Sequence, residues 1–207
     1  MPKLFVSDHP LVSDKLARLR DKNTDPQAFR SLMAEVSMLI GCEVLKGVRN
    51  RKSIVQTPLK ASPAVMLDQP LTFVAILRAG LGMIPGLLEL APKAAIGHIG
   101  LYRDEKTLNP VRYYVRLPKK ISSHFVVLCD PMLATGGSAS EAIHILKTDG
   151  AKDIALLTLL SSKQGVARIH RDHPGVPVYT AAVDAVLNGQ GYIVPGLGDA
   201  GDRLFNT

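Results

Sequence analysis

Residues 125–140 read FVVLCDPMLATGGSAS and place an acid and two adjacent glycines directly after an apolar run. Residues 125–129 are apolar and partly β-branched, so they are expected to form a central strand. Asp130 stands at the carboxyl end of this strand, and residues 135–138 have the composition of a turn. This order of strand, acid and glycine turn predicts a ligand-binding loop.

A helix is expected to follow the turn. Ser138 and Glu141 have the spacing of a capping box, which predicts a helix that begins at Ser138 and ends before Gly150. The first N–H groups of a helix suit an anion, because they have no internal partner and lie at the positive end of the helix dipole. Adjacent glycines let the backbone approach a phosphate closely. The stretch therefore predicts an anion site, with an ordinary strand-to-helix turn as the alternative.

Length and composition favour one domain over residues 1–207. The chain has 207 residues, of which 46% are hydrophobic, enough to bury a single core. Cys42 and Cys129 are far apart in sequence, which argues against a disulfide framework or a zinc cluster and predicts buried, reduced thiols. The first residues lack the apolar core of a signal peptide, and no stretch approaches the ~20 apolar residues of a membrane span. We therefore expect a cytoplasmic protein without a membrane partner.

The chain is basic, with 25 Lys and Arg against 18 Asp and Glu and a net charge of +7. This balance favours anionic ligands or nucleic acid as partners without choosing between them. The densest basic cluster consists of Lys46, Arg49, Arg51 and Lys52. We interpret it as a solvated loop, with nucleic-acid binding as the less favoured alternative.

Alternating strand and helix patterns predict an α/β fold with a mostly parallel sheet flanked by helices. Apolar stripes within residues 1–50 predict helices that form an arm or a flanking layer. In parallel sheets of this kind, ligands bind beyond the carboxyl ends of the strands. Strands are expected at 72–77, 94–99, 125–129, 154–160 and 176–183, and helices at 81–90, 138–147 and 164–170.

Three other stretches have the character of a site. ILRAGLG, residues 76–82, places Arg78 at a strand end ahead of two glycines, which suits guanidinium contacts to an anion or a simple glycine turn. Residues 100–120 are charged and partly alternating, which predicts a β-hairpin lid or a plain surface hairpin. YIVPGLGDAGD, residues 192–202, predicts a glycine-rich loop whose backbone groups can bind the edge of a flat polar ligand. The motifs GxxxxGK[ST], HExxH, GxSxG and CxxC are missing, which argues against nucleotide triphosphatases, zinc proteases and serine hydrolases.

Taken together, these stretches resemble the uracil phosphoribosyltransferase family. DPMLATGGS at 130–138 resembles the family's loop for 5-phosphoribosyl 1-pyrophosphate (PRPP), ILRAGLGM at 76–83 its pyrophosphate loop, and YIVPGLGDAGD its uracil-binding tail. The resemblance implies a phosphoribosyltransferase-like twisted sheet with an N-terminal helical arm at 1–50, a lid hairpin at 100–120 and a base-binding tail at 192–207. It also implies transfer of the phosphoribosyl group from PRPP to uracil, which gives UMP and pyrophosphate in pyrimidine salvage, with Mg²⁺ as cofactor.

The same resemblance implies a role for each matching residue. Asp130 would hold the ribose hydroxyls, and residues 134–138 would cradle the 5′-phosphate. Arg78 and Arg103 would bind the pyrophosphate, with Mg²⁺ held mainly through substrate and water rather than by protein ligands. We further hypothesise that Asp199 helps to draw the proton from the attacking uracil nitrogen. The implied catalytic residues are Asp130, Asp199 and Arg103; the implied PRPP-binding residues are Arg78, Arg103, Asp130, Pro131, Met132, Leu133, Ala134, Thr135, Gly136, Gly137, Ser138 and Asp199; the implied uracil-binding residues are Ile193, Gly198, Asp199 and Ala200.

The chain departs from the family pattern in two places. Where members have an acidic stretch resembling YEATxDL, this chain has CEVLKG at 42–47 and then the basic cluster, and Ala75 replaces the usual proline. Neither departure touches a site motif. The resemblance implies a homodimer or homotetramer and carries GTP over only as a candidate effector. The alternatives are a phosphoribosyltransferase for another base and an RNA-binding pyrimidine regulator of the same fold.

Overall fold

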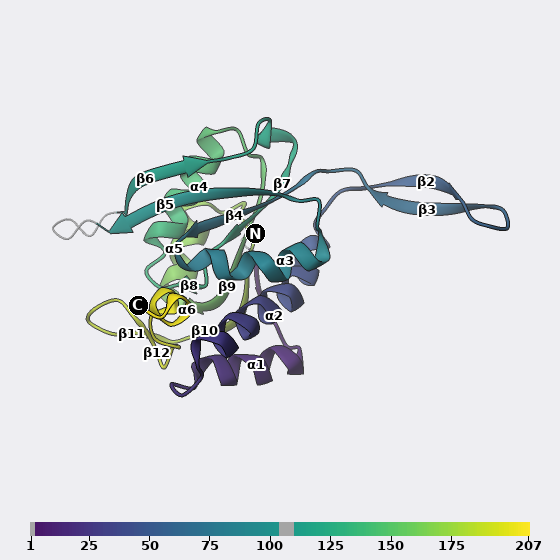
Figure 1. Cartoon of the computed structure of the whole chain (residues 1–207). Helices are drawn as coiled ribbons and strands as arrows, with labels where there is room; N and C mark the ends of the chain where they lie inside the picture. Colours follow the sequence, from purple (N-terminus) through teal and green to yellow (C-terminus); the bar gives the residue numbers. More distant parts are fainter. Residues whose placement is uncertain (1–2, 104–109) are drawn as a thin grey trace.

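A twisted, mostly parallel sheet forms the centre of the computed structural model, which describes residues 3–103 and 110–207 (Figure 1). Neighbouring strands of this sheet run parallel, except that the last two are antiparallel. The predicted α/β class, with a mostly parallel sheet between helices, is therefore confirmed. In sheet order the strands are β1 (Leu4–Val6), β10 (Val178–Asp184), β9 (Asp153–Ser162), β7 (Phe125–Cys129), β4 (Leu71–Leu77), β5 (Ala95–Arg103) and β6 (Pro110–Arg116), with β8 (Met132–Leu133) beside β9.

Both faces of the sheet are apolar, as a parallel sheet covered by helices requires. Within β7, Val126 and Leu128 belong to one buried cluster, and Val127 and Cys129 belong to the other. This alternation explains why the central strands read as continuous apolar runs in the sequence. β4, β5, β7, β9 and β10 lie where strands were predicted, and β7 has the predicted bounds.

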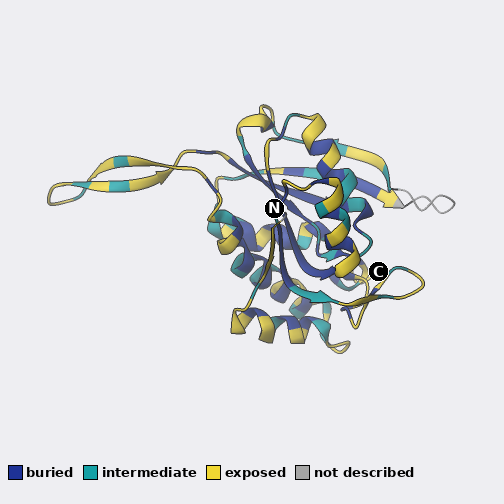
Figure 2. Cartoon of the chain, turned by 180° about the vertical axis from the view of Figure 1, so that it is seen from behind, coloured by how far each residue is buried: buried dark blue, intermediate teal, exposed yellow. Residues whose placement is uncertain are grey.

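Helices cover the two faces unequally (Figure 2). Residues 10–45 form two helices that pack into the larger cluster, so this part of the predicted N-terminal arm is a layer of the body. The edge strand β1 precedes these helices and was not predicted. On the first face lie α1 (Pro10–Arg20), α2 (Pro26–Leu45), the 3-10 turn η1 (Ala79–Met83), α3 (Ile84–Leu90) and α6 (Ala200–Phe205); on the second lie α4 (Gly137–Thr148) and α5 (Lys163–Asp172); a further 3-10 turn, η2 (Ile121–Ser123), precedes β7.

The segment that projects from the body is a hairpin of β2 (Asn50–Gln56) and β3 (Ala61–Leu67), which pair antiparallel (Figure 1). Sequence analysis missed this hairpin, because its strands lie in solvent and carry no continuous apolar run. Arg51 and Lys52 of the basic cluster lie on β2, so the prediction of a solvated loop was wrong for this part of the cluster. A second small hairpin joins β11 (Val186–Leu187) to β12 (Ile193–Val194).

Three local predictions need correction or restriction. The capping box is wrong: α4 begins at Gly137, and its N-cap is Gly136 in the left-handed region (φ 77°) without a side-chain cap bond. Cys129 is buried as predicted, but Cys42 is exposed on the outer side of α2. The predicted lid at 100–120 coincides in part with the β5–β6 hairpin, and residues 104–109 lie outside the described residues.

Within the described part of the chain, no helix is both long and apolar enough to cross a membrane.

Candidate active site

The carboxyl ends of three neighbouring strands bring the predicted charged residues to one edge of the sheet. β4 lies between β5 and β7, and all three run parallel. Arg78 directly follows β4, Arg103 is the last residue of β5, and Asp130 directly follows β7. The backbone of Arg103 therefore lies where the prediction requires, while its side chain is outside the described part. This edge is where α/β sheets bind ligands.

The loop after β7 forms a small pocket of about 40 Å³ lined by Asp130 and residues 132–139. Pro131 holds the loop to the sheet, because its carbonyl accepts hydrogen bonds from the N–H groups of Leu159 (3.1 Å) and Leu160 (3.0 Å). Gly136 turns the chain into α4 through a positive φ, which favours glycine. All nine residues of the predicted PRPP loop are thus either at this pocket or part of its support.

The Asp130 carboxyl group has an unusual environment for an acid. Burial at the end of β7 raises its pKa from 3.8 to about 7, although the Met132 backbone N–H, which donates to the carboxylate, lowers the pKa in part. Burial also raises the pKa of the neighbouring Cys129 thiol, which is therefore neutral at physiological pH. An acid with a pKa displaced this far, at the mouth of a pocket, is typical of a functional site.

A larger pocket of about 250 Å³ opens beside the loop, and its lining includes every residue predicted to bind uracil. Met132 and Ala134 line both pockets, so the loop forms a shared wall between them. Sequence analysis missed Gln190 and Gly191, which line this pocket directly before the predicted tail. The lining residues are Met132, Ala134, Gln190, Gly191, Tyr192, Ile193, Gly198, Asp199 and Ala200.

The wall formed by the tail is held by an ion pair that sequence analysis did not find. Arg20 at the end of α1 donates two hydrogen bonds to the Asp184 carboxylate, with distances of 2.7 and 2.8 Å. The same guanidinium donates to the Gly196 carbonyl (2.8 Å), and the Gly196 N–H donates to Asp184 (3.0 Å). The Arg20 guanidinium lowers the pKa of Asp184, although burial opposes this shift. The turn at Gly196 is thereby fixed to both α1 and β10.

A second arginine, Arg203, lies within the tail and holds it against the N-terminal helices. Arg203 on α6 donates to the carbonyl groups of Leu197 (2.7 Å) and Leu19 (2.5 Å), and it lies 4.4 Å above the ring of Phe29. Arg203 is the only Lys or Arg after Arg171, but no local pattern in the sequence indicates which backbone carbonyls it binds.

The tail does not remain a loop as predicted, because α6 begins at Ala200. Asp199 is its N-cap, and the Asp199 Oδ1 accepts a hydrogen bond from the Asp202 N–H (2.9 Å). Asp199 therefore faces the larger pocket from a fixed position, with one carboxylate oxygen engaged in the cap.

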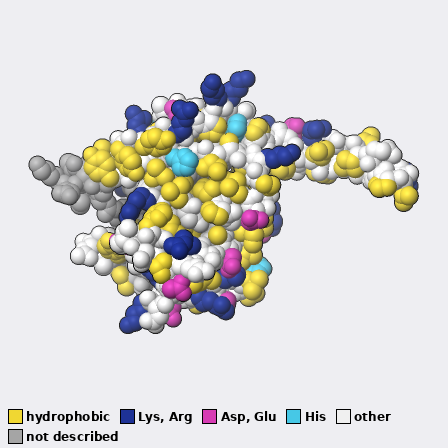
Figure 3. All heavy atoms as spheres, viewed as in Figure 1, with side chains coloured by type: hydrophobic (Ala, Val, Ile, Leu, Met, Phe, Trp, Pro, Cys, Tyr) yellow, Lys and Arg dark blue, Asp and Glu magenta, His cyan; other side chains and the backbone are white. Residues whose placement is uncertain are grey.

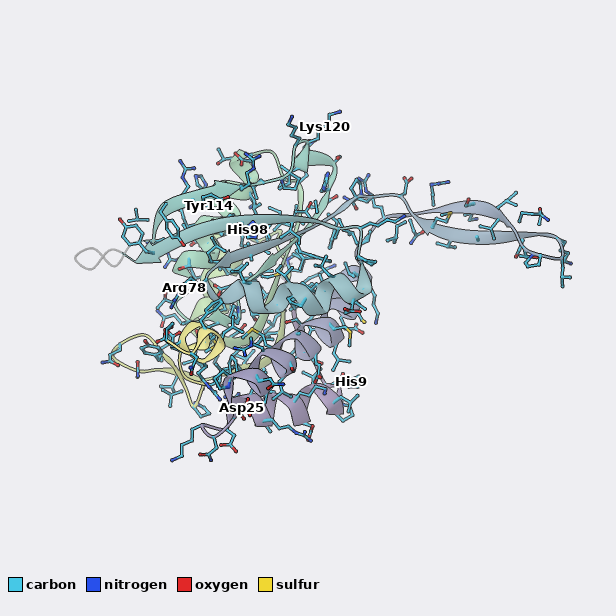
Figure 4. All side chains as sticks on the ribbon, in the orientation of Figure 1. His9, Asp25, Arg78, His98, Tyr114 and Lys120 are labelled. Atoms are coloured by element: carbon cyan, nitrogen blue, oxygen red, sulfur yellow. The ribbon has the colours of Figure 1, made fainter. Side chains whose placement is uncertain are left out.

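Arg78 connects the strand edge to the tail. Its Nη2 lies 3.3 Å from the Asp202 carboxylate, and its guanidinium lies 5.5 Å from the centre of the Phe205 ring. Figure 4 shows Arg78 between the end of β5 and α6. Both side chains of the ion pair are more than half exposed, so the pair contributes little stability and can be exchanged for an anionic ligand.

The comparisons with known proteins agree with this geometry. The family model described as "Uracil phosphoribosyltransferase" matches residues 6–207. The chain belongs to the uracil phosphoribosyltransferase family. A protein with this name from Dictyoglomus thermophilum is 52% identical over 205 residues, which cover 99% of both chains. One from Bacillus cytotoxicus is 50% identical over 208 residues and covers both chains completely.

Solved structures support the fold of this family member. A protein from Aquifex aeolicus matches with a TM-score of 0.92 and 33% identity, over 98% of this chain and 97% of that one. A hypoxanthine phosphoribosyltransferase from Trypanosoma cruzi matches with a TM-score of 0.50 and 17% identity, over 79% and 71% of the two chains. The second likeness concerns the fold alone and confirms the predicted phosphoribosyltransferase-like sheet.

Proposed function

We propose that this family member transfers the phosphoribosyl group from PRPP to uracil and releases UMP and pyrophosphate. The observation that carries the proposal is the shared wall of the two pockets. Met132 and Ala134 line both the small pocket of the glycine loop and the larger pocket at the tail. A nucleotide has the same arrangement, with a base and a 5′-phosphate joined through a ribose. Family membership across residues 6–207 supports the same reaction.

The reaction needs positioning and charge stabilisation more than a nucleophile. Displacement of pyrophosphate at the anomeric carbon passes through a ribosyl group with oxocarbenium character, as in glycoside chemistry. We assign the ribose hydroxyls to Asp130, whose ionised carboxylate accepts their hydrogen bonds. The 5′-phosphate is assigned to the N–H groups of residues 134–138, at the start of α4.

The pyrophosphate is assigned to Arg78 and Arg103 at neighbouring strand ends. Among the described residues, no group of three or more His, Cys, Asp or Glu could hold a metal ion. We propose that Mg²⁺ keeps most of its ligands from substrate oxygens and water, where it would neutralise charge on the leaving pyrophosphate.

The base is assigned to the tail. Uracil is flat and offers two carbonyls and a ring N–H, which we assign to backbone donors and acceptors of Ile193, Gly198 and Ala200, residues that line the larger pocket. A site built from such hydrogen bonds rejects bases that leave its groups unpaired. Asp199 lies in the same wall and is our candidate for the group that draws the proton from uracil.

A panel of bases tests this function. Purified protein with PRPP and Mg²⁺ is incubated separately with uracil, cytosine, hypoxanthine, guanine and xanthine, and nucleotide formation is measured. We expect UMP from uracil and no comparable product from the other bases. Preferential turnover of a purine would overturn the base assignment, and no turnover with any base would overturn the enzymatic proposal.

The RNA-binding alternative is tested on Arg49 and Arg51, which lie at the base of the projecting hairpin. Arg51 is more than half exposed and pairs with Asp68 at 3.3 Å, and neither arginine is among the residues that line the two pockets. The double variant Arg49→Ala and Arg51→Ala should retain uracil turnover. A regulator would instead lose salt-sensitive RNA affinity in this variant.

We also propose a homo-oligomer that covers the β2–β3 hairpin. An isolated two-stranded hairpin is marginally stable in water, and this one exposes Ile54 and Val65 on the same face, at 76% and 69%. Figure 3 shows hydrophobic side chains along the projecting hairpin. The double variant Ile54→Lys and Val65→Lys should reduce the molecular mass in light scattering after gel filtration. An unchanged mass would contradict the proposal.

Addition of GTP to the wild-type assay and mass measurement tests the candidate effector.

A further inference from the structure

The first turn of α5 is fastened directly to the glycine loop. Ser162 is the N-cap of α5, and its Oγ accepts a hydrogen bond from the Gly165 N–H (2.8 Å). The same hydroxyl donates to the Ala134 carbonyl in the loop (2.5 Å). The Ser162 side chain therefore caps α5 and at the same time holds the loop at Ala134.

Gly165 brings α5 as close to the loop as the backbone allows. A Cβ atom at this position would lie 2.6 Å from the carbonyl oxygens of both Leu133 and Ala134. Since such a separation is shorter than real Cβ contacts, only glycine permits this approach. The helix face that carries Gly165 is thus fixed against the loop.

Arg168 lies one turn further along this face and extends along the two glycines of the loop. A Cβ at Gly136 would lie 3.2 Å from both Cβ and Cδ of Arg168, and a Cβ at Gly137 would lie 3.4 Å from its Nη1. The guanidinium therefore lies beside the first residue of α4, where the loop's N–H groups begin.

The charge of Arg168 is only partly compensated. Its Nε lies 3.4 Å from the Asp172 carboxylate, while Arg171 makes a closer contact with the same carboxylate at 2.8 Å. Two guanidinium groups thus share one carboxylate, which leaves positive charge next to the loop. The Arg168 side chain is 38% exposed, so its end can turn towards a ligand.

We propose that Arg168 binds the 5′-phosphate of the ribosyl substrate and adds a charge-assisted contact to the neutral N–H donors of the loop. This inference rests on the proposed function only in its choice of substrate. A phosphate dianion is poorly neutralised by backbone donors alone, and a guanidinium can donate two hydrogen bonds to it at once. Arg168 then increases affinity for every ligand with a 5′-phosphate and leaves affinity for pyrophosphate unchanged.

The test compares Arg168→Gln, Arg168→Lys and Arg171→Gln by titration calorimetry with ribose 5-phosphate, UMP and Mg²⁺-pyrophosphate. We expect Arg168→Gln to weaken binding of ribose 5-phosphate and UMP about tenfold, the scale of one charge-assisted hydrogen bond, with pyrophosphate binding unchanged. The lysine variant should retain most of the affinity. Arg171→Gln is the matched control, because it removes an equal charge and a partner of the same Asp172.

Two results would overturn the inference. One is wild-type affinity of Arg168→Gln for ribose 5-phosphate and UMP. The other is an equal loss for pyrophosphate together with a lower melting temperature, which would give Arg168 a structural role. The titrations measure binding and do not depend on turnover. A wild-type protein that formed no UMP in the base panel would therefore contradict the proposed reaction without changing the result for Arg168.

Discussion

Arg20 and Asp184 are 164 residues apart in sequence but form a two-bond ion pair, with Nη1–Oδ2 and Nη2–Oδ1 distances of 2.7 and 2.8 Å. Both partners also hydrogen-bond to Gly196, which lies two residues after β12. The helix α1 therefore controls the position of the wall that carries Gly198 and Ala200. We interpret the pair as a positioning device for the base pocket.

Arg20→Gln should weaken uracil binding more than PRPP binding, because the Gly196 turn loses its support while the loop at 130–138 is untouched. We expect the KM for uracil to increase about tenfold and the free energy of unfolding to decrease by about 1.5–3 kcal/mol, the range for hydrogen bonds to charged groups. Steady-state kinetics and denaturant titration measure these effects. Arg18→Gln is the control on the same helix, since Arg18 is 65% exposed and pairs only with Asp14 at 3.1 Å among the described contacts. Equal effects of the two variants on the KM for uracil would contradict this role.

The pH dependence of PRPP use should follow Asp130. Because the pKa of its carboxyl group is about 7, the ionised form that accepts hydrogen bonds from the ribose is lost as the pH falls below that value. We expect kcat/KM for PRPP to decrease from about pH 8 to about pH 6 along a single titration. The residual activity of Asp130→Asn should lack this titration. A wild-type profile without an acidic limb near pH 7 would remove Asp130 from the ribose site.

Asp130 should also reduce the stability of the folded protein at high pH. Its folded-state pKa exceeds the unfolded value of 3.8, so the folded protein binds the additional proton between these values. This contribution to stability is complete below the unfolded pKa and is lost as the pH rises through about 7. Asp130→Asn should therefore have a higher melting temperature than the wild type at about pH 8, and this difference should shrink as the pH falls towards about 4. A lower melting temperature of the variant at the higher pH would show that the carboxylate stabilises the fold.

Gly80 should be essential for the position of Arg78. A Cβ at this residue would lie 2.5 Å from the Cys129 carbonyl oxygen, so Gly80→Ala must move η1 away from the end of β7. We expect a loss of about 1–3 kcal/mol in the free energy of unfolding, as for overpacked cores, together with a higher KM for PRPP. Gly175→Ala is the control, because nothing lies within 4 Å of a Cβ there. Similar kinetics and stability of the two variants would contradict the steric argument.

The sequence predicts the sheet well because its central strands are buried on both faces, so each appears in the sequence as a continuous apolar run. The PRPP loop could be predicted for a related reason: Asp130 and the glycines at 136 and 137 follow a strand whose bounds are clear. The tail is different. Its supports, Arg20 and Arg203, bind backbone carbonyls on segments more than 170 residues away, and no local pattern records such contacts. The projecting hairpin was missed because its residues face solvent and show no apolar period.

Helix starts were predicted less accurately than strands. Ser138 and Glu141 have the spacing of a capping box, but Gly136 takes the N-cap position because its positive φ already turns the chain into the helix. Conversely, Asp199 caps a helix that was not predicted, since Gly196, Gly198 and Gly201 around it suggested a loop. The backbone freedom of Gly136 decided the start of α4, whereas the Asp199 side chain decided the start of α6.

A crystal structure of the protein with UMP tests the central claim most directly, because the product carries both the base and the 5′-phosphate. We predict that the uracil ring lies in the larger pocket within hydrogen-bonding distance of the backbone of residues 193–200. The phosphate should contact the N–H groups at the start of α4, with the ribose hydroxyls on Asp130. A uracil ring outside this pocket, or a phosphate away from residues 134–138, would contradict the account of a single continuous site.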